Sequence, residues 1–215
     1  MQGVAFVVRS VERVTRFPTR LLVPSLLFLA GPLFADSFEE RLVAAALERT
    51  QYDVTYDGTY YSIAYPGGDV PADRGVCTDV VVRSYRSLGI DLQQRVHEDM
   101  VASFSLYPSR RFWGLTRPDR NIDHRRVPNL QVFFTRHGES LAVTQRAADY
   151  VPGDLVTWMV AGNLPHIGIV TDKIQRDTGN PMIVHNIGAG PQLEDMLFSY
   201  PITGHYRYHP DTATE

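Results

Sequence analysis

The feature that most constrains the fold is the run GDLVTWMVAGNLPHIGIVTD at residues 153–172. Two apolar stretches flank the turn pair Gly162-Asn163, a pattern typical of two strands joined by a short connection. Similar stretches follow later in the chain, with turn residues between them. The C-terminal half therefore predicts an antiparallel sheet with strands at residues 155–160, 166–171, 181–185 and 203–208.

The preceding half has helical periodicity instead. Ser37 and Glu40 form the sequence pattern of a capping box, which predicts a helix over residues 37–50. Cys77 begins a second helix that Gly89 can terminate. Further helices are expected at 91–104 and 128–136, a long ordered loop at 107–128, and a short strand at 60–64. Helices first and an antiparallel sheet afterwards indicate an α+β domain over residues 36–215.

The N-terminus has a different composition from the rest. Residues 1–20 contain four arginines and one glutamate, and the uncharged run Leu21–Ala35 follows. That run is about half as long as a comfortable membrane span, and prolines and a glycine interrupt it. We expect a signal peptide over residues 1–35 and export to the periplasm or the medium. The alternative is an uncleaved membrane anchor.

Charge and motifs exclude several functions. Removal of residues 1–35 leaves 17 basic and 23 acidic residues, a formal charge of −6. Such a chain repels a phosphate backbone, so nucleic acid is not expected as a partner. The sequence contains no glycine-rich phosphate loop, no His-Glu-x-x-His and no Gly-x-Ser-x-Gly. Neither a cofactor nor a metal is expected, although a zinc hydrolase built on His166, His185 and an aspartate is an alternative.

Cys77 is the single cysteine, so an internal disulfide is impossible. A helix N-terminus favours negative charge and lowers the pKa of a thiol, and the same N–H groups can stabilise an oxyanion. We therefore predict that Cys77 is an accessible nucleophile and that His166 is its base. His185 or Asn186 would orient His166, and strand alternation allows only one of these two to face the site.

A cysteine at a helix start, Gly-Asp opening a strand, and His-Ile-Gly-Ile on the next strand resemble the NlpC-type peptidoglycan hydrolases. The runs YPGGDVPADRGVCTDVV, RPDRNIDHRRVPNL and NLPHIGIV resemble a bacterial family of unassigned domains, DUF1287. The resemblance implies a papain-like fold and cleavage of an amide bond in peptidoglycan peptides through an acyl-enzyme. It implies Cys77, His166 and His185 as catalytic residues and places Tyr65 near the nucleophile. NlpC-type enzymes usually have Asp-Cys-Ser-Gly at the nucleophile, and Val76-Cys77-Thr78-Asp79 departs from this.

Charged residues around these positions have two interpretations. Asp73, Arg74 and Asp79 flank Cys77 and either form salt bridges or bind substrate charges. Arg120 and Asp123, on the long loop, either face solvent or form part of a substrate-binding wall. Two other functions remain open: a cysteine-dependent acyltransferase, and a wall-binding module without catalytic activity. The sequence predicts no oligomeric state.

Overall fold

The structure is a computed structural model that describes residues 1–7, 10 and 36–210. The chain divides between Ala35 and Asp36, and the second unit contains every described helix and strand. The predicted signal peptide therefore falls almost wholly outside the described residues. In the described part, no helix has the length and apolar character needed to cross a membrane.

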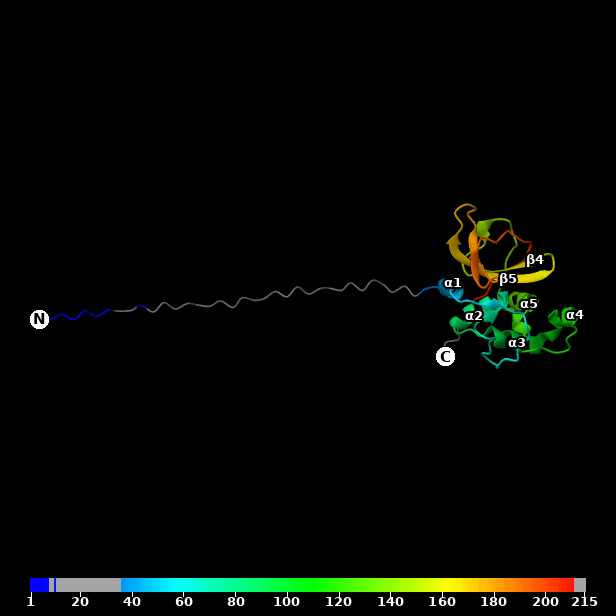
Figure 1. Cartoon of the computed structure of the whole chain (residues 1–215), viewed down its shortest axis with the longest axis horizontal. Coiled ribbons are helices and arrows are strands. Elements are labelled where there is room, and N and C mark those ends of the chain that lie inside the picture. The colour runs from blue at the N-terminus through cyan, green and yellow to red at the C-terminus, as the bar shows by residue number, and fades with distance from the viewer. Residues whose placement is uncertain (8–9, 11–35, 211–215) are drawn as a thin grey trace. The chain divides into compact units, whose positions relative to one another are not determined.

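The second unit combines helices with an antiparallel sheet, which confirms the predicted α+β class (Figure 1). The sheet has six strands in the order β3-β8-β4-β5-β6-β7. Their bounds are β3 Glu139–Ser140, β4 Leu155–Val160, β5 Leu164–Ile174, β6 Pro181–His185, β7 Gln192–Glu194 and β8 Ile202–Arg207. β1 (Thr55–Tyr56) and β2 (Arg74–Gly75) form a separate parallel pair.

Helices precede this sheet in the chain. The α-helices are α1 Phe38–Arg49, α2 Cys77–Ser87, α3 Leu92–Ser103, α4 Ser109–Trp113 and α5 Val127–His137. Three 3₁₀ turns complete the elements: η1 Phe104–Leu106, η2 Asp123–Arg125 and η3 Ala147–Asp149. The capping box of Ser37 and Glu40 is present, and Gly89 follows α2 with a positive φ of 81°. Both features confirm the predicted helix boundaries.

Two apolar clusters cover opposite faces of the sheet because side chains alternate along each strand. On one face, Leu155 of β4 and Ile167 and Ile169 of β5 pack against α1, α2, α3 and α5. On the other, Trp158 of β4 packs with residues that include Met196 and Leu197. This alternation decides which face each candidate histidine occupies.

A buried carboxylate holds the start of β4. Asp154 accepts hydrogen bonds from His205 Nε2 (2.8 Å) and Arg207 Nε (2.8 Å) of β8. Gly153, just before it, has a φ of +89° and lies against Glu39 of α1, where a Cβ would come within 3.2 Å. The Gly153-Asp154 pair of the sequence therefore joins α1, β4 and β8.

Two predictions about the loops were wrong. Residues 60–64 form no strand. The strands in this part of the chain are β1 and β2, which pair with each other, and the paired residues Thr55 and Arg74 are 19 positions apart in the sequence. Residues 107–128 contain α4 and η2 and are not a continuous loop. Both elements are too short to show a repeating apolar pattern.

Candidate active site

Cys77 is the first residue of α2, as the sequence predicted. Asp79 holds this helical turn, because its carboxylate accepts the backbone N–H of Val76 at 2.7 Å. The same carboxylate accepts Arg125 Nε at 2.9 Å and Arg125 Nη2 at 3.0 Å, and both side chains are only 3% exposed. Arg125 also donates to the carbonyls of Asp57 and Thr59. The position of Cys77 thus depends on a buried ion pair.

The Cys77 thiol is buried, with 4% of the residue exposed. Burial raises the pKa of this thiol to about 12 and outweighs the backbone N–H groups of Ile167, Thr78 and Cys77, which lower it. The Asp79 carboxylate contributes to this rise in the pKa. The prediction of an accessible thiolate was therefore wrong for this structure: the thiol is neutral and covered.

His166 and His185 are brought together on neighbouring strands. His166 Nε2 lies 3.1 Å from His185 Nδ1, and the two rings meet edge to face. On its other side, His185 Nε2 lies 2.9 Å from a carboxylate oxygen of Glu194, although the alignment falls short of a hydrogen bond. Glu194 was not predicted, and it extends the pair into a row of three side chains.

This row determines where the protons lie. The negative charge of Glu194 favours a proton on the nearest nitrogen, His185 Nε2. His185 Nδ1 then carries a lone pair that accepts a hydrogen bond from the N–H of His166 Nε2. The tautomer assigned in this way leaves His166 Nδ1 unprotonated. That nitrogen is the one able to accept a proton from another group.

The pKa values of both histidines are lowered. Burial, and to a smaller extent His185, lower the pKa of His166 to about 3. Burial also lowers the pKa of His185, against the opposing effect of Glu194. Both imidazoles are therefore neutral at pH 7.

Gly168 explains how the histidines meet. A Cβ at this position would lie 2.6 Å from Ile183 Cγ2 and 3.1 Å from His185 Cβ. Real Cβ atoms do not come within 3 Å of such neighbours, so only glycine lets β6 approach β5 here. The His-Ile-Gly-Ile pattern thus has a packing reason as well as a chemical one.

The thiol and the histidine row lie on opposite faces of the sheet at β5. Ile167 packs with Cys77 on the helix-covered face, and its N–H faces the sulfur. His166, one residue earlier, lies on the other face with its ring 6.1 Å from that of Trp158. Within the described residues the hydrogen bond of His166 goes to His185, and none joins it to Cys77. Of the three predicted catalytic residues, the structure brings His166 and His185 together and leaves Cys77 on the opposite face of the sheet.

The other orienting candidate, Asn186, faces away from the histidines. Its side-chain nitrogen donates to the Gly75 carbonyl at 3.4 Å, and its side-chain oxygen accepts Gly188 N–H at 3.1 Å. Strand alternation therefore separates His185 and Asn186, as predicted, with His185 on the side of His166.

A tyrosine does lie near the nucleophile, but at another position. Tyr65 packs against His97, with ring centroids 5.0 Å apart, and the Arg120 guanidinium lies 5.7 Å from its ring. Tyr56 of β1 is the residue beside Cys77: burial raises the pKa of Tyr56, and Cys77 and Asp79 raise it further. The distance in sequence from Cys77 could not predict the position of Tyr56. The loop at 57–73 lets β2, just before Cys77, pair with β1, and this pairing brings Tyr56 close.

The charged candidates are distributed among local contacts. Asp73 lies 3.5 Å from Arg74 in an exposed pair, and the Arg120 carbonyl accepts Gln93 Nε2. Asp123 is 1% exposed and accepts the Asp119 N–H and Arg126 Nη1. Burial raises the pKa of Asp123 to about 6. Asp123 thus stabilises the turn before α5.

The described residues contain no group of three or more His, Cys, Asp or Glu side chains placed to hold a metal ion.

Comparison with known proteins assigns the family. The model of a family described as "Domain of unknown function (DUF1287)" matches residues 43–208. The chain belongs to the DUF1287 family. It is also 53% identical, over 153 residues, to the uncharacterized protein YijF of Escherichia coli (strain K12), a match that covers 71% of this chain and 73% of the relative.

Proposed function

We propose that this DUF1287 protein is an exported, papain-like cysteine hydrolase that cleaves an amide bond in peptidoglycan peptides. The observation that supports the proposal is the row His166–His185–Glu194, which begins one residue from Ile167, the β5 residue that packs with Cys77. Acyl transfer requires a thiol and a base held in one tautomer, and Cys77 and His166 would supply these two groups.

The reaction would proceed in two steps. The Cys77 sulfur would attack the amide carbonyl carbon while His166 Nδ1 takes the thiol proton, and His166 would then pass this proton to the leaving amine. This transfer requires a rearrangement that brings the thiol and His166 Nδ1 within hydrogen-bond distance, because the two groups lie on opposite faces of β5. Water next attacks the acyl-enzyme, gives its proton to His166, and releases the carboxylic acid together with the thiol. The backbone N–H groups at the start of α2 would stabilise the oxyanion.

The buried thiol decides how the nucleophile would be activated. With a pKa of about 12, Cys77 is not a preformed thiolate, so the proton must leave during the attack. The covering of the thiol must also open for substrate. Tyr56, partly exposed beside Cys77, is the residue that substrate would displace.

The substrate class follows from the expected export and from the resemblance to NlpC-type enzymes. An exported bacterial enzyme meets cell-wall peptides as an abundant amide polymer. Acyl transfer to an amine would use the same residues. The burial of Cys77 is a specific observation that favours a second candidate, a wall-binding module without turnover.

The deciding experiment is digestion of purified cell-wall fragments with the mature chain, followed by mass analysis of the products. We expect new fragments with the native chain and none with Cys77→Ala, a substitution that a core position tolerates. His185→Asn should also remove most activity. Binding of fragments without any product from the native chain would support the wall-binding module instead.

A further inference from the structure

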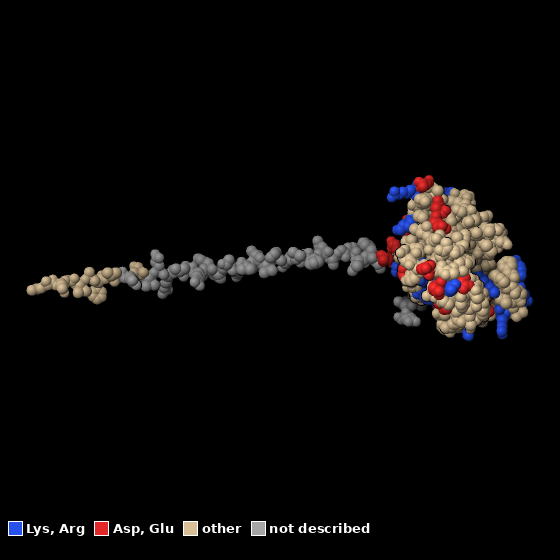
Figure 2. Space-filling view, in the orientation of Figure 1, with Lys and Arg blue, Asp and Glu red and all other residues tan. Residues whose placement is uncertain are grey.

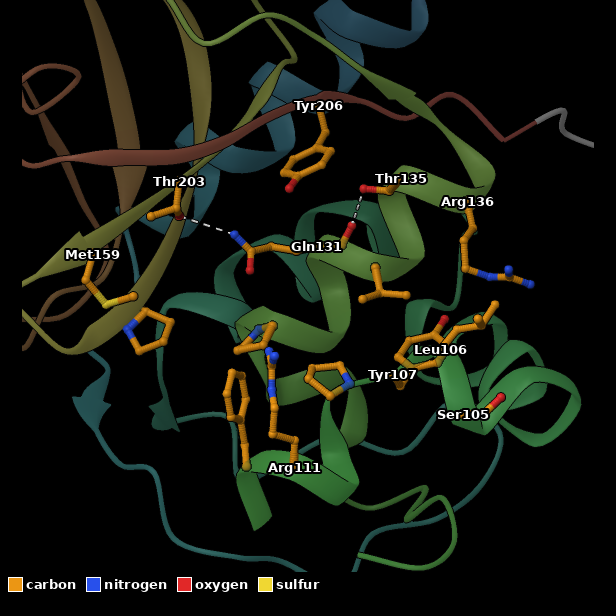
Figure 3. A pocket seen from close by; sticks show the side chains of 15 residues that line it. Ser105, Leu106, Tyr107, Arg111, Gln131, Thr135, Arg136, Met159, Thr203 and Tyr206 are labelled. Carbon is orange, nitrogen blue, oxygen red and sulfur yellow. Dashed lines mark hydrogen bonds between the residues drawn. The ribbon is translucent and has the colours of Figure 1, made fainter. Parts of the chain in front are cut away.

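A hollow lies away from Cys77, between α4, α5 and the ends of β4, β5 and β8 (Figure 3). Its volume is about 680 Å³, which is within the range of small-ligand sites. We call it the α4 groove, and its wall on β5 is Pro165, the residue before His166.

One cation in the α4 groove has no acidic partner. Arg136 lines the groove, but its guanidinium binds Asp99 at 2.8 and 2.9 Å. Arg111 lines it too, and among the described side chains no carboxylate lies within ion-pair distance of it. In Figure 3, Arg111 extends from α4 toward α5, into the hollow. Its guanidinium carbon lies 4.5 Å from the centroid of the Phe112 ring. A guanidinium without a carboxylate partner can bind a carboxylate.

An amide oxygen is free on the opposite wall. Gln131 of α5 donates its side-chain nitrogen to Thr157 Oγ1 at 2.9 Å and to Thr203 Oγ1 at 3.2 Å. Its oxygen has no donor among the described residues and points away from Thr203 into the groove (Figure 3). A carboxamide oxygen with both lone pairs unused accepts an N–H group.

The remaining wall is apolar. Leu106 and Phe112 on one side, and Met159 and Pro165 on the other, line the groove. Leu106 and Phe112 are 56% and 52% exposed, so burying them under a ligand would be favourable.

We propose that the α4 groove binds the C-terminal end of a short peptide with a free carboxylate. The carboxylate pairs with Arg111, the preceding backbone N–H donates to Gln131, and an aliphatic side chain packs on Met159 and Pro165. Only the source of the natural peptide rests on the proposed function, because binding requires no bond cleavage.

Binding is measured by NMR titration of the mature chain carrying Cys77→Ala, which prevents turnover. The probe is acetyl-Ala-Ala with a free carboxylate, compared with its C-terminal amide and with propionate. We expect the methyl resonance of Met159 to shift with the acid, and affinity to fall roughly tenfold or more for the amide. Propionate should bind more weakly than the peptide because it lacks the N–H and the second side chain.

Two neighbouring arginines provide a matched pair of variants. Arg111→Gln should reduce affinity for the acid about tenfold or more, whereas Arg110→Gln, which does not line the groove, should leave it unchanged. Gln131→Leu should weaken the binding of the peptide but not the binding of propionate. Equal binding of acid and amide, equal losses in the two arginine variants, or no shift at Met159 would each overturn the proposal. A chain that binds the peptide but cleaves no wall fragment would contradict only the proposed function.

Discussion

Asp79 and Arg125 form a bidentate ion pair, at 2.9 and 3.0 Å, that fastens the start of α2 to the turn before α5. Both side chains are almost fully buried, so removing one partner leaves the other charge unpaired in the interior. We expect Asp79→Asn to lower the free energy of unfolding by about 3–5 kcal/mol. Urea denaturation followed by circular dichroism measures this.

The ion pair also has a double-mutant test. Asp79→Asn combined with Arg125→Met should cost less than the sum of the two single changes, because neither charge then stays unpaired. The exposed pair Asp73–Arg74 is the control, and its Asp73→Asn variant should change stability by less than about 1 kcal/mol. Strictly additive losses at Asp79 and Arg125 would contradict the role given to the pair.

Glu194 should affect catalysis more than stability. Its side chain is 45% exposed, so Glu194→Gln should fold normally, but it removes the charge that holds the proton on His185 Nε2. For an orienting partner of this kind we expect a loss of about 10- to 100-fold in kcat, with little change in KM. The pH dependence of kcat should change as well, because the tautomer of His166 is no longer fixed.

Gln192 offers the control for Glu194. It lies on the same short strand and pairs with His185 through the backbone only. Gln192→Ala should retain activity toward wall fragments. If both variants lost activity equally, β7 would matter for folding and Glu194 would have no role in orienting His185.

Acid should destabilise the fold through its buried histidines. Burial lowers the pKa of His124, as of His166, to about 3, whereas an unfolded chain binds these protons near pH 6.5. The contribution of these neutral histidines to the free energy of unfolding is complete above pH 6.5 and is lost as the pH falls from 6.5 toward 3. For each histidine, the free energy of unfolding should be about 2 kcal/mol lower at pH 5 than at pH 7. Asp123 acts in the opposite sense, since its raised pKa favours folding as pH falls from 6 toward 3.8.

Thermal unfolding between pH 7 and pH 4.5 tests the histidine effect. His124→Asn should flatten the decline in melting temperature, whereas His209→Asn, on the surface beside Glu39, should leave the slope unchanged. An unchanged slope in His124→Asn would show that other groups cause the acid sensitivity.

The export prediction concerns residues that lie mostly outside the described part, and protein chemistry can test it. Intact-mass measurement of protein recovered from the periplasm or medium should give a chain that begins at Asp36. Met1 on a membrane-bound product would support the anchor instead.

The sequence predicted the elements whose periodicity is local. The strands at 155–160 and 181–185 and the helix that begins at Cys77 match the structure, because alternation, caps and breakers lie within the segments themselves. The pairing of Thr55 with Arg74 is not local, and no pattern in either segment could predict it. α4 has five residues, fewer than two helical turns, and gives no periodic signal.

The candidate site was predictable only in part for the same reason. Cys77 and His166 belong to recognisable local contexts, a helix start and a strand with a nearby glycine. Glu194 reaches His185 because β7 pairs with β6, and a single glutamate in a polar stretch carries no sign of that pairing. The burial of Cys77 was also unpredictable, since it depends on the packing of α2 against β5.

The covered thiol has a consequence for the resistance of the protein to oxidation. Oxidation to sulfenic acid requires an exposed, thiolate-like cysteine. A resting protein with Cys77 in its present place should therefore withstand peroxide, and two copies should not crosslink through a disulfide. Damage would be confined to the moments when a bound peptide has opened the site. The extent of oxidative inactivation would then depend on the number of catalytic turnovers and not on elapsed time.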